Sequence, residues 1–287
     1  MNAAIIVLYN PDEERLKNNV NAVKNQVSCI IFVDNAKMSS IDSFIKEADI
    51  EDKAVYINNE GNKGIAYALN RGIEYCVCNG ISWALTLDQD SIVPCNMISE
   101  YEKYTSNPDI GIICCTINYN DKETYFAGKS DAYAYVDECI TSASYIRTSL
   151  CEQLGGFDER MFIDRVDFEY CYRLTKKGFK IIQVRDVILA HQLGDLQVEK
   201  IGREKIHVGG HSAFRKFYMA QNLVYCHRKH PEKFSTVFVL VKLFKLSAKT
   251  LVYEKQKAKK IVAILKVSLN GMKMPVEEEN WLRESQQ

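Results

Sequence analysis

Two aspartates, Asp88 and Asp90, lie two positions apart at the end of the apolar run Ile81–Leu87. Paired carboxylates are hard oxygen ligands that suit Mg²⁺ or Mn²⁺, and such an ion can carry the diphosphate of a substrate. An Asp-x-Asp pair alone is weak evidence for a metal site, because the same pattern often occurs in exposed turns. The pair therefore indicates a metal site only if other polar groups converge on the same strand end.

Further acids lie between Asp158 and Asp167, ahead of the helical pattern Phe168–Lys177. Asp164 suits the N-cap of that helix. A carboxylate at a helix start could also act as a general base. His191 follows a predicted strand, and its imidazole would be acceptable to Mn²⁺, although a lone histidine is more often structural.

The elements that must position these residues alternate between strands and helices. Apolar runs predict four strands, at Ala3–Tyr9, Cys29–Val33, Ala54–Ile57 and Trp83–Leu87. Helical spacing follows the first and third of them, from Asp12 and from Ile65. This alternation is typical of a mostly parallel sheet, in which ligands bind beyond the carboxyl ends of the strands. We therefore expect the residues just after the strands to converge, namely Tyr9, Asn10, Asp34, Asn62 and Asp88.

The rest of the chain predicts a mixed sheet and a helical C-terminal region. Further strands are expected at Ile110–Ile117, Ala132–Val136, Cys139–Ile146 and Phe179–Val184. Helices are expected at Thr148–Leu154 and Phe168–Lys177, and helical patterns dominate from His211 onward. The fold class is therefore α/β, with helices flanking the sheet.

Two other binding folds are disfavoured. The turn Tyr9–Glu13 has no glycine fingerprint, and its acids would repel the pyrophosphate of a nicotinamide cofactor. The Gly-x-x-Gly at Gly61–Gly64 resembles an RNA-binding loop, but no basic aromatic surface accompanies it, so we expect no nucleic-acid partner. A turn or cap role for Asp34 remains open.

Composition points to a cytoplasmic protein. Ten cysteines without a Cys-x-x-Cys pair indicate reduced thiols, and the first residues carry no export signal. No apolar run reaches the roughly 18 residues that span a bilayer.

Charge is unevenly distributed along the chain. The net charge is zero, but from Arg228 to Lys273 twelve basic residues stand against two acids, which is +10. One helical face there consists of Val237, Leu240, Val241, Phe244, Ala248 and Leu251. This helix either packs on the domain or attaches the protein to an anionic membrane surface, with Lys255, Lys257, Lys259 and Lys260 following it.

Together these motifs resemble the inverting family 2 glycosyltransferases with the GT-A nucleotide-sugar-binding fold. The matching segments, in order, are Ile6–Pro11, Val33–Asn35, Asn62–Gly64, Ala68–Gly72, Asp88–Ser91, Leu154–Glu159, Phe162–Glu169, His191–Gly194 and Arg215–Asn222. The resemblance covers roughly residues 3 to 230. It predicts a glycosyltransferase domain over 1–230 and a basic helical region over 231–287. Within the family the chain looks most like bacterial rhamnosyltransferases of O-antigen and capsule synthesis.

The resemblance implies a role for each candidate residue. Asp167 would be the catalytic base, and Asp88, Asp90 and His191 would hold Mn²⁺ or Mg²⁺. The donor nucleotide would meet Tyr9, Asn10, Asp34, Asn62, Lys63, Gly64 and Asp88. The acceptor side would include Ser142, Asp164 and Arg165.

The implied donor is dTDP-rhamnose and the implied acceptor a lipid-linked or polysaccharide hydroxyl, reached at the inner face of the cell membrane. A UDP-galactofuranose or UDP-hexose transferase is the alternative, as is a catalytically silent nucleotide- or glycan-binding partner. One departure from the family concerns Ala143, which stands where a glycine is expected.

Overall fold

The computed structural model describes residues 1–119, 122–124, 131–190, 196–201, 204–209, 212–253 and 257–276. They form two compact units. The first comprises Met1–Glu159 and Val166–His191, and the second Arg160–Arg165 and Gln192–Glu278. These units are defined by contacts, whereas the expected division at residue 230 follows the motifs and remains a prediction.

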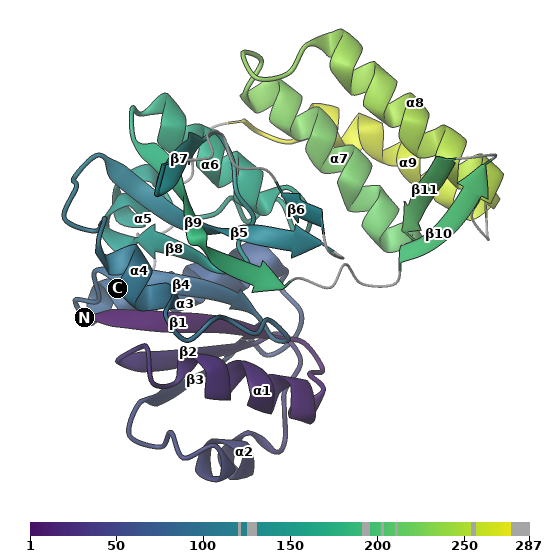
Figure 1. The fold of residues 1–287 in the computed structure, drawn as a ribbon. Coiled ribbons are helices and arrows are strands. Elements are labelled where there is room, and N and C mark those ends of the chain that lie inside the picture. Colours follow the sequence, from purple (N-terminus) through teal and green to yellow (C-terminus); the bar gives the residue numbers. More distant parts are fainter. Residues whose placement is uncertain are drawn as a thin grey trace. The chain divides into compact units, whose positions relative to one another are not determined.

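The first unit is built on a mixed nine-stranded sheet (Figure 1). Four parallel strands form one side in the order β3-β2-β1-β4, with bounds β1 Asn2–Leu8, β2 Cys29–Asp34, β3 Ala54–Asn58 and β4 Trp83–Asp88. The sheet continues β8-β5-β9-β7 and β6 pairs with β5, with bounds β5 Ile110–Tyr119, β6 Lys122–Thr124, β7 Tyr133–Val136, β8 Ser144–Arg147 and β9 Lys180–Ala190. β8 is antiparallel to both neighbours, which makes the sheet mixed as expected.

Helices connect these strands. Their bounds are α1 Glu13–Val23, α2 Ile41–Glu47, α3 Ile65–Cys78, α4 Met97–Glu102, α5 Thr148–Leu154 and α6 Val166–Lys176. α1 begins where the Asp12 carboxylate accepts the Arg15 N–H at 2.9 Å. The short helices α2 and α4 were not predicted, because one or two turns give little periodic signal.

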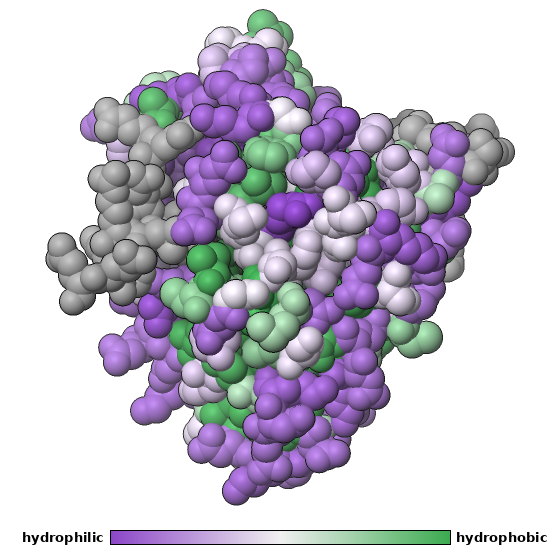
Figure 2. Space-filling model, turned by 90° about the vertical axis from the view of Figure 1, so that its left-hand side faces the viewer, coloured by the Kyte–Doolittle hydropathy of each residue, from purple (hydrophilic) through white to green (hydrophobic). Residues whose placement is uncertain are grey.

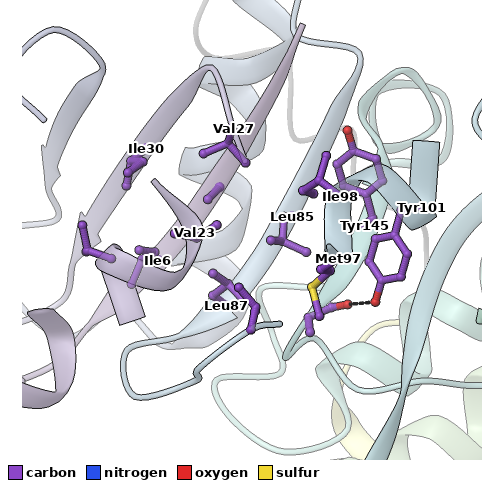
Figure 3. Packing of buried hydrophobic residues seen from close by; sticks show 14 of the residues in the cluster. Ile6, Val23, Val27, Ile30, Leu85, Leu87, Met97, Ile98, Tyr101 and Tyr145 are labelled. Atoms are coloured by element: carbon purple, nitrogen blue, oxygen red, sulfur yellow. Dashed lines mark hydrogen bonds between the residues drawn. The ribbon is translucent and has the colours of Figure 1, made fainter. Parts of the chain in front are cut away.

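A hydrophobic core packs α1 and α4 against the sheet (Figure 3). Leu85 and Leu87 of β4 point toward it, and Tyr101 of α4 is fully buried beside Tyr145. The Tyr101 hydroxyl donates to the Ala143 carbonyl at 2.9 Å. The face drawn in Figure 2 is largely hydrophilic, with hydrophobic and intermediate residues in its middle.

The strand expected over Cys139–Ile146 is confirmed only from Ser144 onward. Ala143 has φ 62°, in the left-handed region, so the chain turns there instead of continuing as a strand. The Ala143 N–H donates to the Thr86 carbonyl at 2.8 Å, and its carbonyl accepts from Tyr101. These bonds hold an alanine in the conformation that favours the expected glycine.

The second unit contains a hairpin and three helices. Strands β10 (Leu196–Ile201) and β11 (Glu204–Gly209) pair antiparallel and were not predicted. The helices are α7 Ala213–Lys229, α8 Thr236–Tyr253 and α9 Lys257–Lys273, and α7 packs closely on α9. Arg228 of α7 donates to the carbonyls of Gly271 and Met274 at 2.9 and 2.8 Å. Across the described ranges, each helix is too short or too polar to cross a membrane.

Candidate active site

The four parallel strands end level with one another. Leu8 is opposite Asp34, Val7 is opposite Asp88, and Asp34 is opposite Asn58 in the strand register. The loops that follow these strands therefore leave the same edge of the sheet, which is where open α/β sheets bind ligands. The four strand ends therefore meet at one edge of the sheet, as expected.

Gln89, between the two aspartates, ties the loop after β4 to the loop after β1. Its Oε1 accepts the Tyr9 N–H at 2.8 Å, and its Nε2 donates to the Tyr9 carbonyl at 3.4 Å. Asn19 of α1 donates to the Asp88 carbonyl at 2.7 Å. Next to Tyr9, Asn10 has φ 46° and is exposed. Amide side chains thus fix the backbone that carries Asp88 and Asp90.

The two aspartates differ in accessibility. Asp88 is half-buried at the end of β4, whereas Asp90 is exposed and its Oδ2 lies 3.9 Å from Arg15 Nη1. A contact of that length between exposed side chains is weak, so it leaves the Asp90 oxygens open to a ligand. No group of three potential metal-ligating side chains gathers within the described ranges. His191, the third predicted ligand, lies outside them.

Asp34 is fully buried and is used by its own loop. Oδ1 accepts N–H groups from Ala36 at 2.7 Å and Lys37 at 3.1 Å, while Oδ2 accepts from Met38 N at 2.6 Å and the Tyr56 hydroxyl at 2.8 Å. Burial alone would raise the pKa of Asp34, but these hydrogen bonds outweigh it, so its pKa lies below the ordinary value. In this structure Asp34 shapes the turn after β2.

Asn35 connects that turn to the loop after β3. It is buried, its Nδ2 donates to the Gly64 carbonyl at 3.1 Å, and its Oδ1 accepts from Asn59 Nδ2 at 3.0 Å. Asn62 Oδ1 accepts the Gly64 N–H at 3.0 Å, and Gly64 has φ 93° just before α3. Asn62 and Lys63 are therefore presented on an ordered, exposed loop at the same sheet edge.

Ser142 lies beside the Asp-x-Asp segment. Its hydroxyl is 2.7 Å from the Ser91 hydroxyl, and both residues are buried. Ser142 also lines a cavity of about 390 Å³ together with Glu138, Cys139 and Phe168. The loop before β8 and the start of α6 both line this cavity.

Asp167 lies in the first turn of α6, where the helix dipole favours a negative charge. It is half-buried and borders a narrow void with Cys139 and Ile140, which also line the larger cavity. Cys139 and Ile140 therefore separate the void at Asp167 from the cavity at Ser142 by no more than one shared loop.

Glu169, two residues further along α6, cannot act as the general base that is predicted for Asp167. It is fully buried, and both its oxygens accept from Arg173 Nε, at 2.9 and 3.0 Å. Arg173 also donates to the carbonyls of Leu154 and Gly156, which anchors α6 to the end of α5. This ion pair fixes the helix that presents Asp167.

The Gly-Gly-Phe-Asp-Glu segment is locked to α3 by Asn70. Asn70 Oδ1 accepts the Phe157 N–H at 2.7 Å, and its Nδ2 donates to Phe157 O at 2.9 Å and to Glu159 Oε1 at 2.7 Å. Two motif segments far apart in the sequence therefore support each other.

Asp164 and Arg165 belong to the second unit. Both have left-handed backbone angles, φ 76° and 59°, and Asn222 of α7 donates to the Asp164 carbonyl at 2.8 Å. Burial raises the pKa of Asp164, against the opposing effect of Arg165 and Arg215. Sequence reasoning did not assign a role to Gln89, Asn19 or Asn35, because their partners are distant in the sequence.

Comparisons with known proteins identify the family of this chain. The model of "Glycosyl transferase family 2" matches residues 3–168. The dTDP-rhamnosyl transferase RfbF of Shigella flexneri is 29% identical over 244 residues, which is 79% of this chain and 80% of the relative. The low-salt glycan biosynthesis hexosyltransferase Agl10 of Haloferax volcanii is 24% identical over 259 residues, covering 83% of this chain and 81% of that one.

Solved glycosyltransferase structures have the same fold. GalNAc-T7 with UDP, GalNAc and Mn²⁺ has a TM-score of 0.62 at 14% identity, covering 79% of this chain and 47% of that one. The mannosyltransferase PcManGT of Pyrobaculum calidifontis with GDP-Man and Mn²⁺ has a TM-score of 0.57 at 15% identity, covering 93% of this chain and 75% of that one. TarS 1-349 of S. aureus with UDP-GlcNAc has a TM-score of 0.57 at 11% identity, covering 94% of this chain and 72% of that one. The GT-A fold expected from the sequence is confirmed.

Proposed function

This chain belongs to glycosyl transferase family 2, and from its site we propose that it moves rhamnose from dTDP-rhamnose to a hydroxyl of a glycan acceptor, with inversion at the anomeric carbon. The observation that carries the proposal is the convergence of four strand-end loops around an exposed Asp90 and a half-buried Asp88. The choice of rhamnose is supported by the similarity to a dTDP-rhamnosyl transferase over four fifths of both chains.

The donor nucleotide would bind along the edge formed by Tyr9, Asn10 and the loop with Asn62, Lys63 and Gly64. Tyr9 is 52% exposed, and Asn62 and Lys63 are exposed too, so ring, amide and ammonium groups are available for a base, a ribose and a diphosphate. Asp34 would act by holding the turn after β2, because its oxygens are already used. Its direct contact with the donor stays a prediction.

Asp88 and Asp90 fit a divalent cation. Paired carboxylates suit Mg²⁺ or Mn²⁺, which complete their coordination with substrate phosphates and water. His191 remains a predicted ligand. When bound, the ion would neutralise the negative charge that develops on the leaving diphosphate.

Asp167 would remove the proton from the acceptor. As the acceptor oxygen bonds to the anomeric carbon, the carboxylate takes the hydroxyl proton and the bond from that carbon to the diphosphate oxygen breaks. Attack from the side opposite the diphosphate inverts the anomeric centre in one step. Ser142, which lines the cavity of about 390 Å³, remains an acceptor-side candidate together with Asp164 and Arg165.

Thermal unfolding with added nucleotides tests this proposal. We expect dTDP with Mn²⁺ to stabilise the protein by about 2.7 kcal/mol at a hundredfold excess over Kd, and UDP or GDP at the same concentration to stabilise it less. Asp90→Ala should lose the dependence on Mn²⁺, because it removes a charged oxygen ligand. Asp52→Ala, an exposed carboxylate in a turn away from the strand ends, is the matched control.

The competing outcomes are distinct. Stronger stabilisation by UDP would favour the UDP-galactofuranose or UDP-hexose alternative. Stabilisation without sugar transfer would favour a silent binding partner, and no stabilisation by any nucleotide would overturn the proposal. Unchanged Mn²⁺ dependence in Asp90→Ala would remove this residue from the metal site.

A further inference from the structure

Helix α8 turns a broad apolar face to solvent. This outer face of α8 consists of Val237, Leu240, Val241, Phe244, Ala248 and Leu251. Phe244 is 73% exposed, Val237 69% and Leu240 61%. At 3.6 residues per turn, the six positions fall within about 120° of the helix circumference. The sequence left open whether this face packs on the domain, and the structure exposes it.

The opposite side of α8 makes the internal contacts. Val239 is 5% exposed and Thr250 is fully buried, and both lie on the side of the helix away from Phe244. α8 packs on α7 and α9 within the second unit. The apolar outer face is therefore additional to the face that holds the helix in place. Single exposed apolar residues are ordinary, but a continuous stripe of this size marks an interaction surface.

Lysines border one edge of the outer face. Lys242, Lys245 and Lys249 are exposed and follow one another along α8, and neither α8 nor α9 contains an aspartate or glutamate. Lys257 and Lys259 of α9 are exposed as well. Lys260 is only 6% exposed and is therefore not available to a surface, and Lys255 lies outside the described residues.

We infer that the outer face of α8 lies in the interfacial region of an anionic bilayer, with Phe244 and Leu240 among the acyl chains and the lysines at the phosphates. An apolar helix face with a flanking row of lysines is the pattern of interfacial helices. A second copy of this chain is a poorer occupant, because its α8 and α9 offer no carboxylate to these lysines. This inference does not rest on the identity of the sugar donor.

Vesicle co-sedimentation with the full chain tests the surface. We expect binding to phosphatidylcholine vesicles that contain phosphatidylglycerol, and much weaker binding without the anionic lipid. Replacing Lys242, Lys245 and Lys249 by glutamine should weaken binding on the order of 100-fold at low salt, since each lysine near such a surface contributes about fivefold. Added salt should weaken wild-type binding in the same direction.

A second variant isolates the apolar contribution. Leu240→Ser with Phe244→Ser should weaken binding at least about tenfold, because both side chains would leave the acyl region. The matched controls are Ile188→Ser, an apolar residue of the first unit that is 45% exposed, and a Lys46, Lys176, Lys177 triple glutamine variant. Both controls should bind vesicles like the wild type.

Two results would overturn the inference. One is a wild-type protein that does not bind anionic vesicles at low salt. The other is a wild-type dimer in solution that the Leu240, Phe244 variant dissociates while vesicle binding is unchanged, which would assign the face to a second copy. Sugar transfer to a soluble acceptor should be the same in all these variants, so failure here is distinguishable from failure of the proposed reaction.

Discussion

Asp34 and Asp90 are both carboxylates at the end of a parallel strand, but their surroundings suit them to different roles. Asp34 is fully buried and accepts four hydrogen bonds from its own loop and Tyr56, whereas Asp90 is exposed and has one long contact with Arg15. A carboxylate whose lone pairs are already used stabilises a loop. One with open oxygens can bind a cation.

Asp167→Asn should fold and bind donor but transfer almost no sugar. The amide keeps the size of the side chain and removes the basic oxygen, and loss of a general base typically costs about 10²- to 10⁴-fold in rate. Initial rates with dTDP-rhamnose, together with the thermal response to dTDP, measure both properties. Transfer at the wild-type rate would move the role to Asp164, because Glu169 is buried against Arg173.

Asp34→Asn should lower stability in a pH-dependent way. The pKa of Asp34 is below its ordinary value in the folded protein, so its stabilising effect is present above the unfolded pKa of about 3.9 and is lost as pH falls through the folded pKa. We expect a cost of about 1–3 kcal/mol at pH 7, from weaker bonds to three backbone N–H groups.

Urea unfolding at pH values from 7 downward measures this difference. The gap between wild type and Asp34→Asn should narrow as pH falls from about 4 through the folded pKa of Asp34, because the protonated aspartic acid is then neutral like the asparagine. Asp52→Asn, in an exposed turn, should show little difference at any pH. A gap that is constant with pH would mean that the Asp34 charge does not stabilise the loop.

At the scale of elements, close packing positions the loops. Helix α3, which follows the loop with Asn62, crosses β1 at Gly72. A Cβ atom at Gly72 would lie 2.6 Å from Ile5 Cγ2, and Ile5 is fully buried. Such contacts set the distance between the helix and the sheet, and therefore the place of the nucleotide loop.

Gly72→Ala should destabilise the protein by about 1–3 kcal/mol, the usual cost of overpacking a core. An alanine inside a helix would otherwise gain about 1 kcal/mol over glycine, so the sign of the effect reports the contact with Ile5. Cys78→Ala, at an exposed position of the same helix, is the control and should be neutral or slightly stabilising. Denaturant unfolding of both variants decides the point, and a more stable Gly72→Ala protein would contradict it.

At the scale of the whole molecule, the proposed donor site and the proposed membrane surface lie in different units. The strand-end loops belong to the first unit, and the outer face of α8 belongs to the second. Asp164 and Arg165, three and two positions before Asp167, are counted with the second unit. The chain therefore changes unit just before the helix that carries the proposed base.

Hydrogen exchange should distinguish nucleotide binding by the first unit from vesicle binding by the second. With dTDP and Mn²⁺ we expect slower exchange in the loops after β1, β2, β3 and β4, because these backbone groups surround the nucleotide. Anionic vesicles should slow exchange in α8 and leave those loops unchanged. Protection of α8 by nucleotide alone would show that the units are coupled through the donor.

The sequence alone determined the four parallel strands, the helices α1 and α3, and the place of Asp88 and Asp90 at a strand end. These features follow from local hydrophobic periodicity and from the rule that parallel strands present their carboxyl ends together. The ordered motifs also identified the family, because their residues and spacing recur along the chain.

Only the tertiary structure decided which polar groups are already used within the fold. Asp34 is used by its loop, Glu169 is paired with Arg173, and Gln89 joins two strand ends, because each depends on partners that local periodicity does not specify. The same holds for the outer face of α8. Its apolar period predicts a helix with one apolar face, but whether that face meets the protein or the solvent depends on how three helices pack.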